Sequence, residues 1–315
     1  MTPDMAEPTT VERTPDVVDR GRPRPVPRAG PCGEPEVVKV RRRLGIGFWG
    51  AISWIFLISA AALLAPWLPI ADPDEIGAGP RLGGPSWDNW FGADSNGRDM
   101  FSRTIWGARV SLMVGFVSIV LGFLIGGLVG VVSGYLRGPT DRILSFIIFV
   151  MLSFPSLVLF LLVISIVGQG LWVVSLTLSV LVVPSVARLG RAVTIAFAER
   201  EFVAAARLLG ATKRRVMVRE ILPNVLIPMS ALLLLGLGVT IVAEGGLAYL
   251  NLSVADGFSW GKMINLGAAP RTLRSAPGVA FFPIGAMFLT VLSLNWAGDR
   301  LRQYLDVREL GIGSR

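Results

Sequence analysis

Few residues of this chain have the types and spacing that chemistry requires. The sequence contains no histidine, which excludes histidine-based acid–base catalysis and histidine-ligated zinc or haem. Cys32 is the single cysteine, so a disulfide framework, a cysteine-rich metal site and an internal CxxC redox pair are excluded as well. We therefore predict no catalytic residue and no metal site.

The three lysines are the next candidates, because a phosphate-binding loop places a lysine after a GxxxxG run. Lys39, Lys213 and Lys262 all lie in other contexts. The chain is therefore not expected to bind ATP through such a loop or to act as an enzyme. A process that needs energy must then draw it from another protein.

Glu244 is the one acidic residue placed inside an apolar stretch. A charge is costly in hydrocarbon, so such a residue usually faces the protein interior or an aqueous path. Three interpretations stay open. The residue makes a structural hydrogen bond, it lies near an outer gate or pathway, or it marks the end of a span shorter than its apolar run.

The elements that would position these residues are predicted to be membrane helices. Hydrophobic residues make up 52% of the chain and charged residues 17%, with a mean hydropathy of +0.62, whereas a soluble domain has roughly 25% charged residues. About 20 apolar residues cross the hydrocarbon core. The apolar run 143–187 must therefore hold two helices, with a break at Gly168-Gln169-Gly170. The sequence predicts an all-α integral membrane protein with six transmembrane helices, near 46–68, 109–136, 143–167, 171–190, 224–249 and 278–298.

The remaining segments complete the predicted organisation. Residues 1–43 are rich in proline and charge, which predicts a disordered tail. The apolar run 44–71 begins too late and is too long for a cleavable signal peptide, so it is predicted to hold the first transmembrane helix. Then follow an extracytoplasmic segment 72–108, a five-helix core 109–298 with a loop at 191–223, and a C-terminal tail 299–315.

Positive charge and proline add two further expectations. With both termini in the cytoplasm, 23 of the 30 basic residues fall inside and seven outside, as the positive-inside rule requires. This placement also explains the net charge of +8 without nucleic acid. Pro155, Pro184 and Pro228 are expected to mark kinks or helix ends, because each removes a backbone donor.

The second predicted span carries glycines at a strict four-residue spacing. Residues four apart lie almost on one line of a helix, and a line of glycines lets another helix approach backbone to backbone. We expect a packing role, with a seam that slides between two states as the alternative. The glycines are Gly122, Gly126, Gly130, Gly134 and Gly138.

The loop 191–223 has the pattern of a short helix-turn-helix. Gly210 is well placed to end the first helix in a left-handed cap, and a second helix is predicted from Thr212 to a stop at Pro223. The alanine-rich face of the first helix favours a docking element, while a basic loop lying on anionic lipid is the alternative. Helical spacing (i, i+3, i+4, i+7) assigns this face to Phe202, Ala205, Ala206 and Leu209.

These residues resemble a known family. Ala204-Ala205-Ala206-x-x-x-Gly210, followed by Leu222-Pro223, resembles the EAA loop of permease subunits of ABC importers. The flanks resemble the oligopeptide/dipeptide branch, and the resemblance covers about residues 90–310. Its other anchors are Gly97-Arg98-Asp99, Gly107-Ala108-Arg109, Gly134-Tyr135, Asp141-Arg142, Trp260-Gly261-Lys262, Asn295 to Arg302, and Leu305-Asp306.

The resemblance implies a type I importer permease fold in the plasma (inner) membrane of a prokaryote. It implies a second homologous permease subunit, two cytoplasmic P-loop ATPase subunits that carry ATP and Mg, and an extracytoplasmic substrate-binding protein, with lipid around the spans. Short peptides are the implied cargo, with nickel chelates, glutathione or another small solute as alternatives. The implied ATPase-coupling residues are Glu201, Phe202, Ala204, Ala205, Ala206, Leu209, Gly210, Leu222 and Pro223.

Four positions depart from the family pattern. Ala204 replaces the glutamate that names the loop, and Glu220 stands where an isoleucine is expected. Phe146 and Phe149 replace an arginine and an aspartate near the start of the third span. A gradient-driven secondary transporter or channel is the less favoured alternative, because Glu244 is the only ionisable residue deep in a span and no internal repeat is visible.

Overall fold

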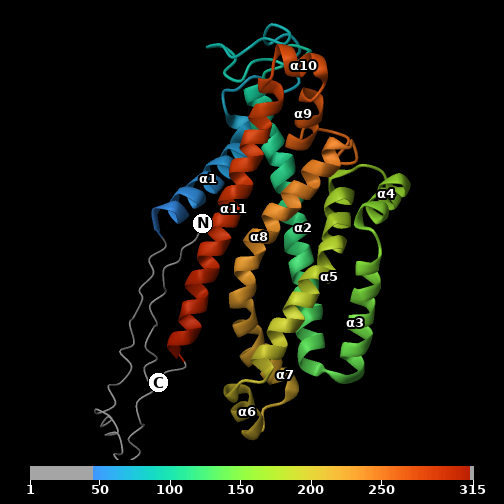
Figure 1. Ribbon diagram of the computed structural model, residues 1–315, viewed down its shortest axis with the longest axis vertical. Coiled ribbons are helices and arrows are strands. Elements are labelled where there is room, and N and C mark those ends of the chain that lie inside the picture. Colours follow the sequence, from blue (N-terminus) through green and yellow to red (C-terminus); the bar gives the residue numbers. More distant parts are fainter. Residues whose placement is uncertain (1–44, 313–315) are drawn as a thin grey trace, which may run out of the picture. The chain divides into compact units, whose positions relative to one another are not determined.

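The computed structural model describes the chain over residues 45–312, and its side chains over residues 45–305. The predicted tail 1–43, including Cys32, lies outside the described residues. Among these residues the regular secondary structure is helical and includes no strand, with irregular segments at 68–99 and 250–259. The helices (Figure 1) are α1 (Gly45–Leu64), α2 (Met100–Leu136), α3 (Gly138–Ser153), α4 (Ser156–Val167), α5 (Leu171–Ala198), α6 (Glu201–Leu208), α7 (Lys213–Arg215), α8 (Leu222–Tyr249), α9 (Trp260–Gly267), α10 (Pro270–Ser275) and α11 (Gly278–Ile312).

Five described segments are long and apolar enough to cross a membrane. A sixth span exists if α3 and α4, which are bent by 83° at the break between them, count as one. The prediction of an all-α membrane protein with six spans is confirmed on that count. The five segments are Gly45–Trp67, Met100–Leu136, Leu171–Ala198, Lys213–Tyr249 and Gly278–Leu305.

The predicted span 143–167 is divided into α3 and α4, and the expectation of a kink or helix end at Pro155 is confirmed. Phe154, which ends α3, has an extended backbone with φ −80° and ψ 133°. The ring of Pro155 disfavours the helical conformation at the preceding residue, so the chain turns there before α4 begins. The other two prolines act differently, since Pro184 lies inside α5 and Pro228 inside α8 without ending either helix.

Helix ends differ from the prediction in the second and fourth spans. The first span, Gly45–Trp67, agrees with the predicted 46–68 and ends at a short 3-10 turn, Ala65–Trp67, where Pro66 lacks the amide hydrogen that would extend the helix. The second starts at Met100, within the predicted extracytoplasmic segment, because the Asp99 carboxylate accepts a hydrogen bond from the Ser102 amide at 2.8 Å and caps the helix. The fourth runs on to Ala198, since no glycine or proline interrupts residues 191–198.

The glycines of α2 lie against α5, and the two helices run side by side in Figure 1. A β-carbon added to any of four glycines would stand 2.6–2.8 Å from an atom of α5, so the two backbones are in direct contact. These are Gly122, Gly126, Gly130 and Gly134. The fifth, Gly138, does not belong to this seam because α2 ends at Leu136; it opens α3 with a φ of +68° and faces open space.

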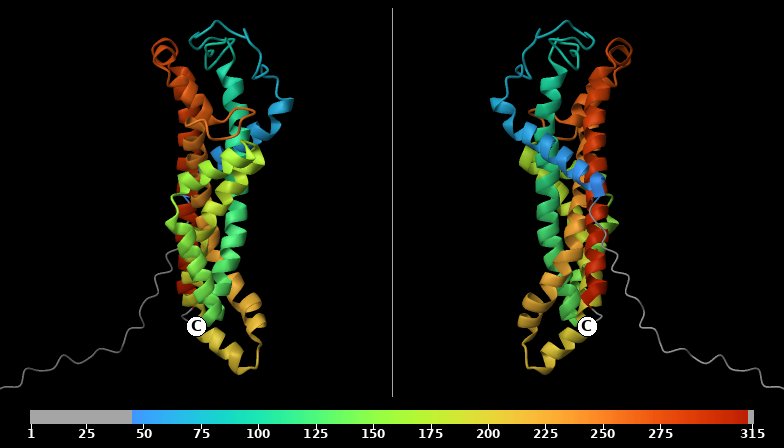
Figure 2. Two further views of the ribbon diagram at one scale, coloured as in Figure 1. Left: turned by 90° about the vertical axis from the view of Figure 1, so that its right-hand side faces the viewer. Right: turned by 90° about the vertical axis from the view of Figure 1, so that its left-hand side faces the viewer.

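The remaining spans pack around this pair. α8 lies against α2 and α11, and α3 and α4 lie against α5. α1 crosses α11 and α2 obliquely (Figure 2), where Trp54 Nε1 donates a hydrogen bond to Thr290 Oγ1 at 3.2 Å. A buried apolar cluster joins α1, α2, α8, α9 and α11, and includes Ile58, Ile241 and Leu294. The same bundle holds α6 and α7 at one end and α9 and α10 at the other (Figure 1).

Candidate functional site

The segment between α5 and α8 forms a helix-turn-helix whose turn is fixed by hydrogen bonds. α6 ends in a Schellman motif, in which the Gly210 amide donates to Arg207 O at 3.0 Å and the Ala211 amide donates to Ala206 O at 3.1 Å. Gly210 has a φ of +80°, the left-handed conformation that glycine adopts without strain. The turn therefore has one defined geometry, and α6 is held at a fixed angle to the spans.

The two faces of α6 have different environments. Val203 is fully buried and packs in a cluster with Val216 and Ile221. On the other side, Leu208 and Leu209 are 89% and 88% exposed. The predicted apolar face divides accordingly, because Ala206 is half-buried against this cluster while Phe202, Ala205 and Leu209 are exposed, as are Glu201 and Ala204.

The second helix of the motif begins as predicted but does not stop at Pro223. Thr212 caps α7, with its Oγ1 accepting a hydrogen bond from the Arg215 amide at 3.3 Å. The helix then widens into a π segment, Val216–Ile221, and continues into α8, where Leu222 and Pro223 form the first turn. Pro223 has no backbone N–H to donate a hydrogen bond, and the π segment that precedes it lets the helix continue without a break.

Glu244 lies in a buried polar cluster at the end of the bundle opposite α6. Its Oε2 accepts from Ser111 Oγ of α2 at 3.0 Å, and its Oε1 accepts from Ser253 Oγ at 2.8 Å. Ser111 Oγ also accepts from the Trp260 amide at 3.2 Å. Glu244 is not the end of a span, because α8 continues to Tyr249. The carboxylate joins α2, α8 and the start of α9.

Lys262 closes the loop that follows Ser253. Its Nζ donates to the carbonyl oxygens of Ala255 and Gly257, at 2.6 Å and 3.3 Å. Burial lowers the pKa of Lys262, against the opposing effects of Asp256 and Glu244. Gln169, between α4 and α5, holds the same loop through a hydrogen bond from its Nε2 to Asn251 O at 3.0 Å. The ends of four helices are thus tied together here.

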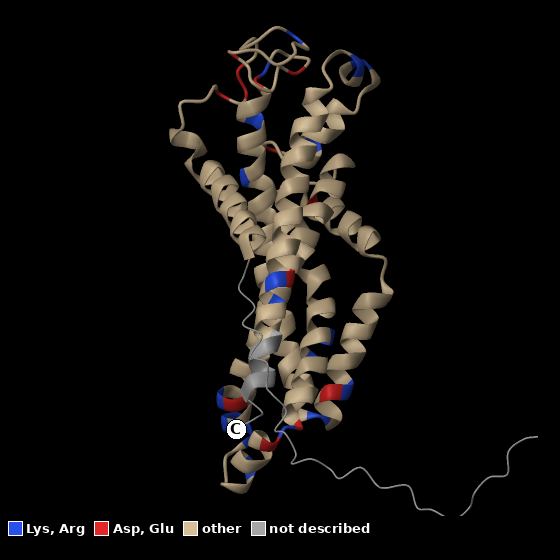
Figure 3. Cartoon of the chain, turned by 60° about the vertical axis from the view of Figure 1, so that its left-hand side comes forward, with Lys and Arg blue, Asp and Glu red and all other residues tan. Residues whose placement is uncertain are grey.

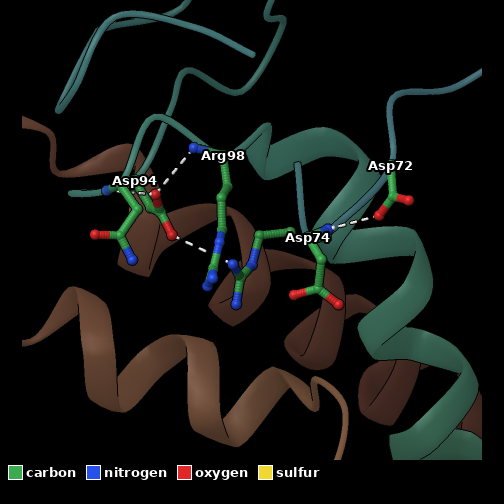
Figure 4. Close-up of polar contacts among 6 residues, drawn as sticks. Asp72, Asp74, Asp94 and Arg98 are labelled. Atoms are coloured by element: carbon green, nitrogen blue, oxygen red, sulfur yellow. Dashed lines mark hydrogen bonds and ion pairs between the residues drawn. The ribbon is translucent and has the colours of Figure 1, made fainter. Parts of the chain in front are cut away.

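The segment that precedes α2 is anchored by a buried ion pair (Figure 4). Asp94 accepts from the backbone amides of Asn96 and Arg98 through Oδ1, and from Arg103 Nη1 through Oδ2 at 3.3 Å. Arg103 is 3% exposed and lies 3.9 Å from the centre of the Phe258 ring. One arginine of α2 therefore holds both the segment that precedes α2 and the loop before α9.

A large apolar cavity of about 710 Å³ lies between α2, α4, α5 and α8. Its wall is mostly aliphatic, with Ser156, Ser185 and Thr240 as its hydroxyl-bearing residues. The bend at Pro155 turns α4 towards this space and makes it one wall of the cavity, through Leu157 and Phe160.

The positions that depart from the family pattern have visible surroundings. Phe146 and Phe149 are 66% and 69% exposed on α3 and face away from the bundle. The carbonyl of Glu220 accepts from Asn224 Nδ2 at 2.6 Å, within the π segment and the start of α8. Sequence reasoning missed Ser111, Ser253 and Arg103. A polar side chain in an apolar run was the available signal for the two serines.

Comparison with known proteins gives consistent results. The family described as "Binding-protein-dependent transport system inner membrane component" matches residues 122–309. The chain is 37% identical over 246 residues to the dipeptide transport system permease protein DppC of Alkalihalophilus pseudofirmus, covering 78% of this chain and 80% of that protein. It is 35% identical over 255 residues to the glutathione transport system permease protein GsiD of Pectobacterium atrosepticum, covering 80% and 84%.

A solved structure shows the same fold. An inward-facing conformation of the MetNI methionine ABC transporter superposes with a TM-score of 0.55 at 21% identity, covering 65% of this chain and 97% of that one. The helical bundle and these matches define a transport subunit of a type I ABC importer, a multi-pass protein of the inner membrane. The chain belongs to the family of inner membrane components of binding-protein-dependent transport systems. Such permease subunits are transport components rather than catalysts.

Proposed function

We propose that this chain forms, with a second homologous permease subunit, the path through which short peptides enter the cell. The relative named for dipeptide transport, at 37% identity over 78% of the chain, carries this proposal. The apolar cavity between α2, α4, α5 and α8 also suits a peptide path, because its aliphatic wall can accommodate different peptide side chains without selecting a particular one. The chain itself binds no cofactor in this account.

Glutathione is the second candidate cargo. The relative named for glutathione transport is 35% identical over 80% of the chain, nearly as similar as the dipeptide relative. Glutathione is itself a short peptide, so the two candidates share their chemistry. We place the discrimination between them in the extracytoplasmic binding protein that delivers the cargo.

Two cytoplasmic P-loop ATPase subunits, with ATP and Mg, are proposed to drive the cycle through α6. This short helix presents exposed Phe202, Ala205, Leu208 and Leu209, an apolar surface that a groove on a partner could cover. Its buried side, through Val203, transmits the movement to the π segment and α8. ATP and cargo then stabilise two packings of the spans in turn.

The orientation follows from the same assignment. α6 and α7 lie at the end of the bundle that carries most of the arginine and lysine residues near the spans (Figure 3). Cytoplasmic segments retain positive charge. We therefore place this end, and both chain termini, in the cytoplasm, and the segment before α2 together with α9 and α10 outside.

Uptake in the native host tests the function. A strain lacking this chain should lose energy-dependent uptake of a labelled dipeptide and regain it with the plasmid-borne gene. Excess unlabelled glutathione should compete only if glutathione is also cargo. Unchanged dipeptide uptake in the deletion strain, with loss of glutathione uptake, would replace the first candidate by the second.

A further inference from the structure

A second cavity lies beside α6 and has the opposite character to the apolar one. It has a volume of about 600 Å³ and is formed where the ends of α2 and α5 meet α6 and α7. The lining includes four cationic side chains and one carboxylate, Glu199. The cations are Arg137, Arg200, Arg207 and Lys213.

The charges of this cavity are only partly neutralised within the chain. Arg137 Nη2 lies 2.6 Å from Glu199 Oε1, which accounts for the carboxylate. Among the described residues, Arg207 and Lys213 form no ion pair. The lining of the cavity therefore carries an excess of positive charge.

Aromatic rings hold two of the guanidinium groups in place. Arg207 lies 5.4 Å from the centre of the Tyr135 ring, and Arg200 lies 4.8 Å from that of Phe197. A ring attracts a cation without cancelling its charge, so the contact with Tyr135 orients the Arg207 guanidinium and leaves it able to bind an anion. Orienting this group in advance reduces the entropy lost on binding.

The donors favour one class of anion. Guanidinium groups present a planar fork that matches two phosphate oxygens, and a lysine adds a compact point charge. Leu136, beside the cations, is 43% exposed and marks the apolar end of the α2 span. Basic pockets between membrane helices at the cytoplasmic side suit lipid headgroups in this way.

We propose that this cavity binds a phosphate group, carried by an anionic membrane lipid or by a soluble phosphate compound. The bound phosphate connects Arg207 of α6 to the ends of α2 and α5, and so steadies the helix that moves during the cycle. The proposal goes beyond the import function and does not depend on the cargo. The lipid source alone depends on the orientation given above.

Native mass spectrometry of the full-length chain in neutral detergent tests the site. The chain is mixed with phosphatidylglycerol, or with phosphatidylcholine as the uncharged comparison, at 150 mM ammonium acetate. At that ionic strength charges more than about 8 Å away are screened. Wild-type protein should retain phosphatidylglycerol in preference to phosphatidylcholine, and Arg207→Gln/Lys213→Gln should bind it roughly 30-fold more weakly, as expected for the loss of two cations.

The matched control removes the same charge from the same segment. Arg214 and Arg215 neighbour Lys213 but lie outside the cavity lining. Arg214→Gln/Arg215→Gln should retain phosphatidylglycerol like the wild type. Equal loss in both double variants would overturn the site, because general attraction to the basic segment would then explain the retention.

A second measurement separates the two sources of phosphate. Isothermal titration with inorganic phosphate, in the absence of added lipid, detects a soluble ligand. Binding that disappears in Arg207→Gln/Lys213→Gln, without selective lipid retention, supports the soluble source, and lipid retention supports the membrane source. If neither ligand distinguishes the wild type from this variant, the proposal is wrong.

A charge-preserving variant provides a further control. Arg207→Lys/Lys213→Arg keeps both positive charges and should bind the same ligand as the wild type. If this variant elutes as folded protein and does not bind that ligand, the proposal is overturned.

Discussion

The carbonyl oxygen of Ala187 lies 2.6 Å from the position that a β-carbon on Gly130 would occupy. Any side chain at this position must push α5 away from α2. Gly127 lies on the same helix, and the nearest atom to its β-carbon position, Met229 Cε, is 4.0 Å away. The two glycines therefore make a matched pair for testing the seam.

Gly130→Ala is expected to destabilise the protein by about 1–3 kcal/mol, the usual cost of overpacking. Gly127→Ala should be neutral or stabilising by up to about 1 kcal/mol, because alanine is the better helix former. Thermal unfolding of both variants in detergent measures the difference. Equal stability of the two variants would show that α2 and α5 are not in close contact at Gly130.

The Gly210 turn should be needed for transport but not for membrane insertion. Gly210→Pro cannot adopt a φ of +80° and removes the amide that donates to Arg207 O, so α6 loses its angle to α8 and uptake should be abolished. Gly210→Asn tolerates the left-handed conformation and should keep most of the uptake. Uptake assays with quantified membrane levels give the comparison, and normal uptake by Gly210→Pro would remove α6 from the mechanism.

Glu244 is expected to act as a structural acceptor. Glu244→Leu leaves the Ser253 hydroxyl buried without its partner, a cost of about 1–3 kcal/mol per orphaned group. Adding Ser253→Ala should recover part of the loss, because the double variant removes the orphaned hydroxyl as well. Detergent unfolding temperatures decide this point. Full stability of Glu244→Leu together with lost uptake would favour a role in the pathway instead.

The ion pair between Asp94 and Arg103 should stabilise far more than its exposed counterpart. Asp94→Asn keeps an oxygen for the amides of Asn96 and Arg98 but leaves Arg103 buried without its partner charge, at a cost of about 3–5 kcal/mol. The ion pair of Glu199 with Arg137 is more than half exposed, so Glu199→Gln should cost about 1 kcal/mol or less. Similar losses of unfolding free energy in both variants would contradict the difference in burial.

Sequence patterns predicted the features that follow from local residue spacing and missed those that depend on tertiary contacts. Spans follow from length and hydropathy, and the conformation of Gly210 follows from its place after an apolar helical face. A kink or helix end was predicted at Pro155, but equally at Pro184 and Pro228, which occur in similar apolar runs and end no helix. Only the surrounding packing decides whether a proline breaks a span.

The partners of Glu244 were equally invisible in the sequence. Ser111 lies on another span, 133 residues away, and a single serine in an apolar run has no pattern that assigns its neighbour. The cavity beside α6 is a similar case, because Arg137 and Arg207 come to line one space only when α2, α5 and α6 converge. The basic residues themselves were visible in the sequence, but their arrangement around one space was not.

Purification of the tagged full-length chain from its native host tests whether α6 couples this permease to separate ATPases. Mild detergent and mass spectrometry should identify a second six-span chain and P-loop ATPases. Ala205→Arg, which places a long charged side chain on the exposed face of α6, should retain the second chain and lose the ATPases. If the wild-type chain is recovered as a homo-oligomer without any ATPase, α6 has no coupling role and a gradient-driven transporter is favoured.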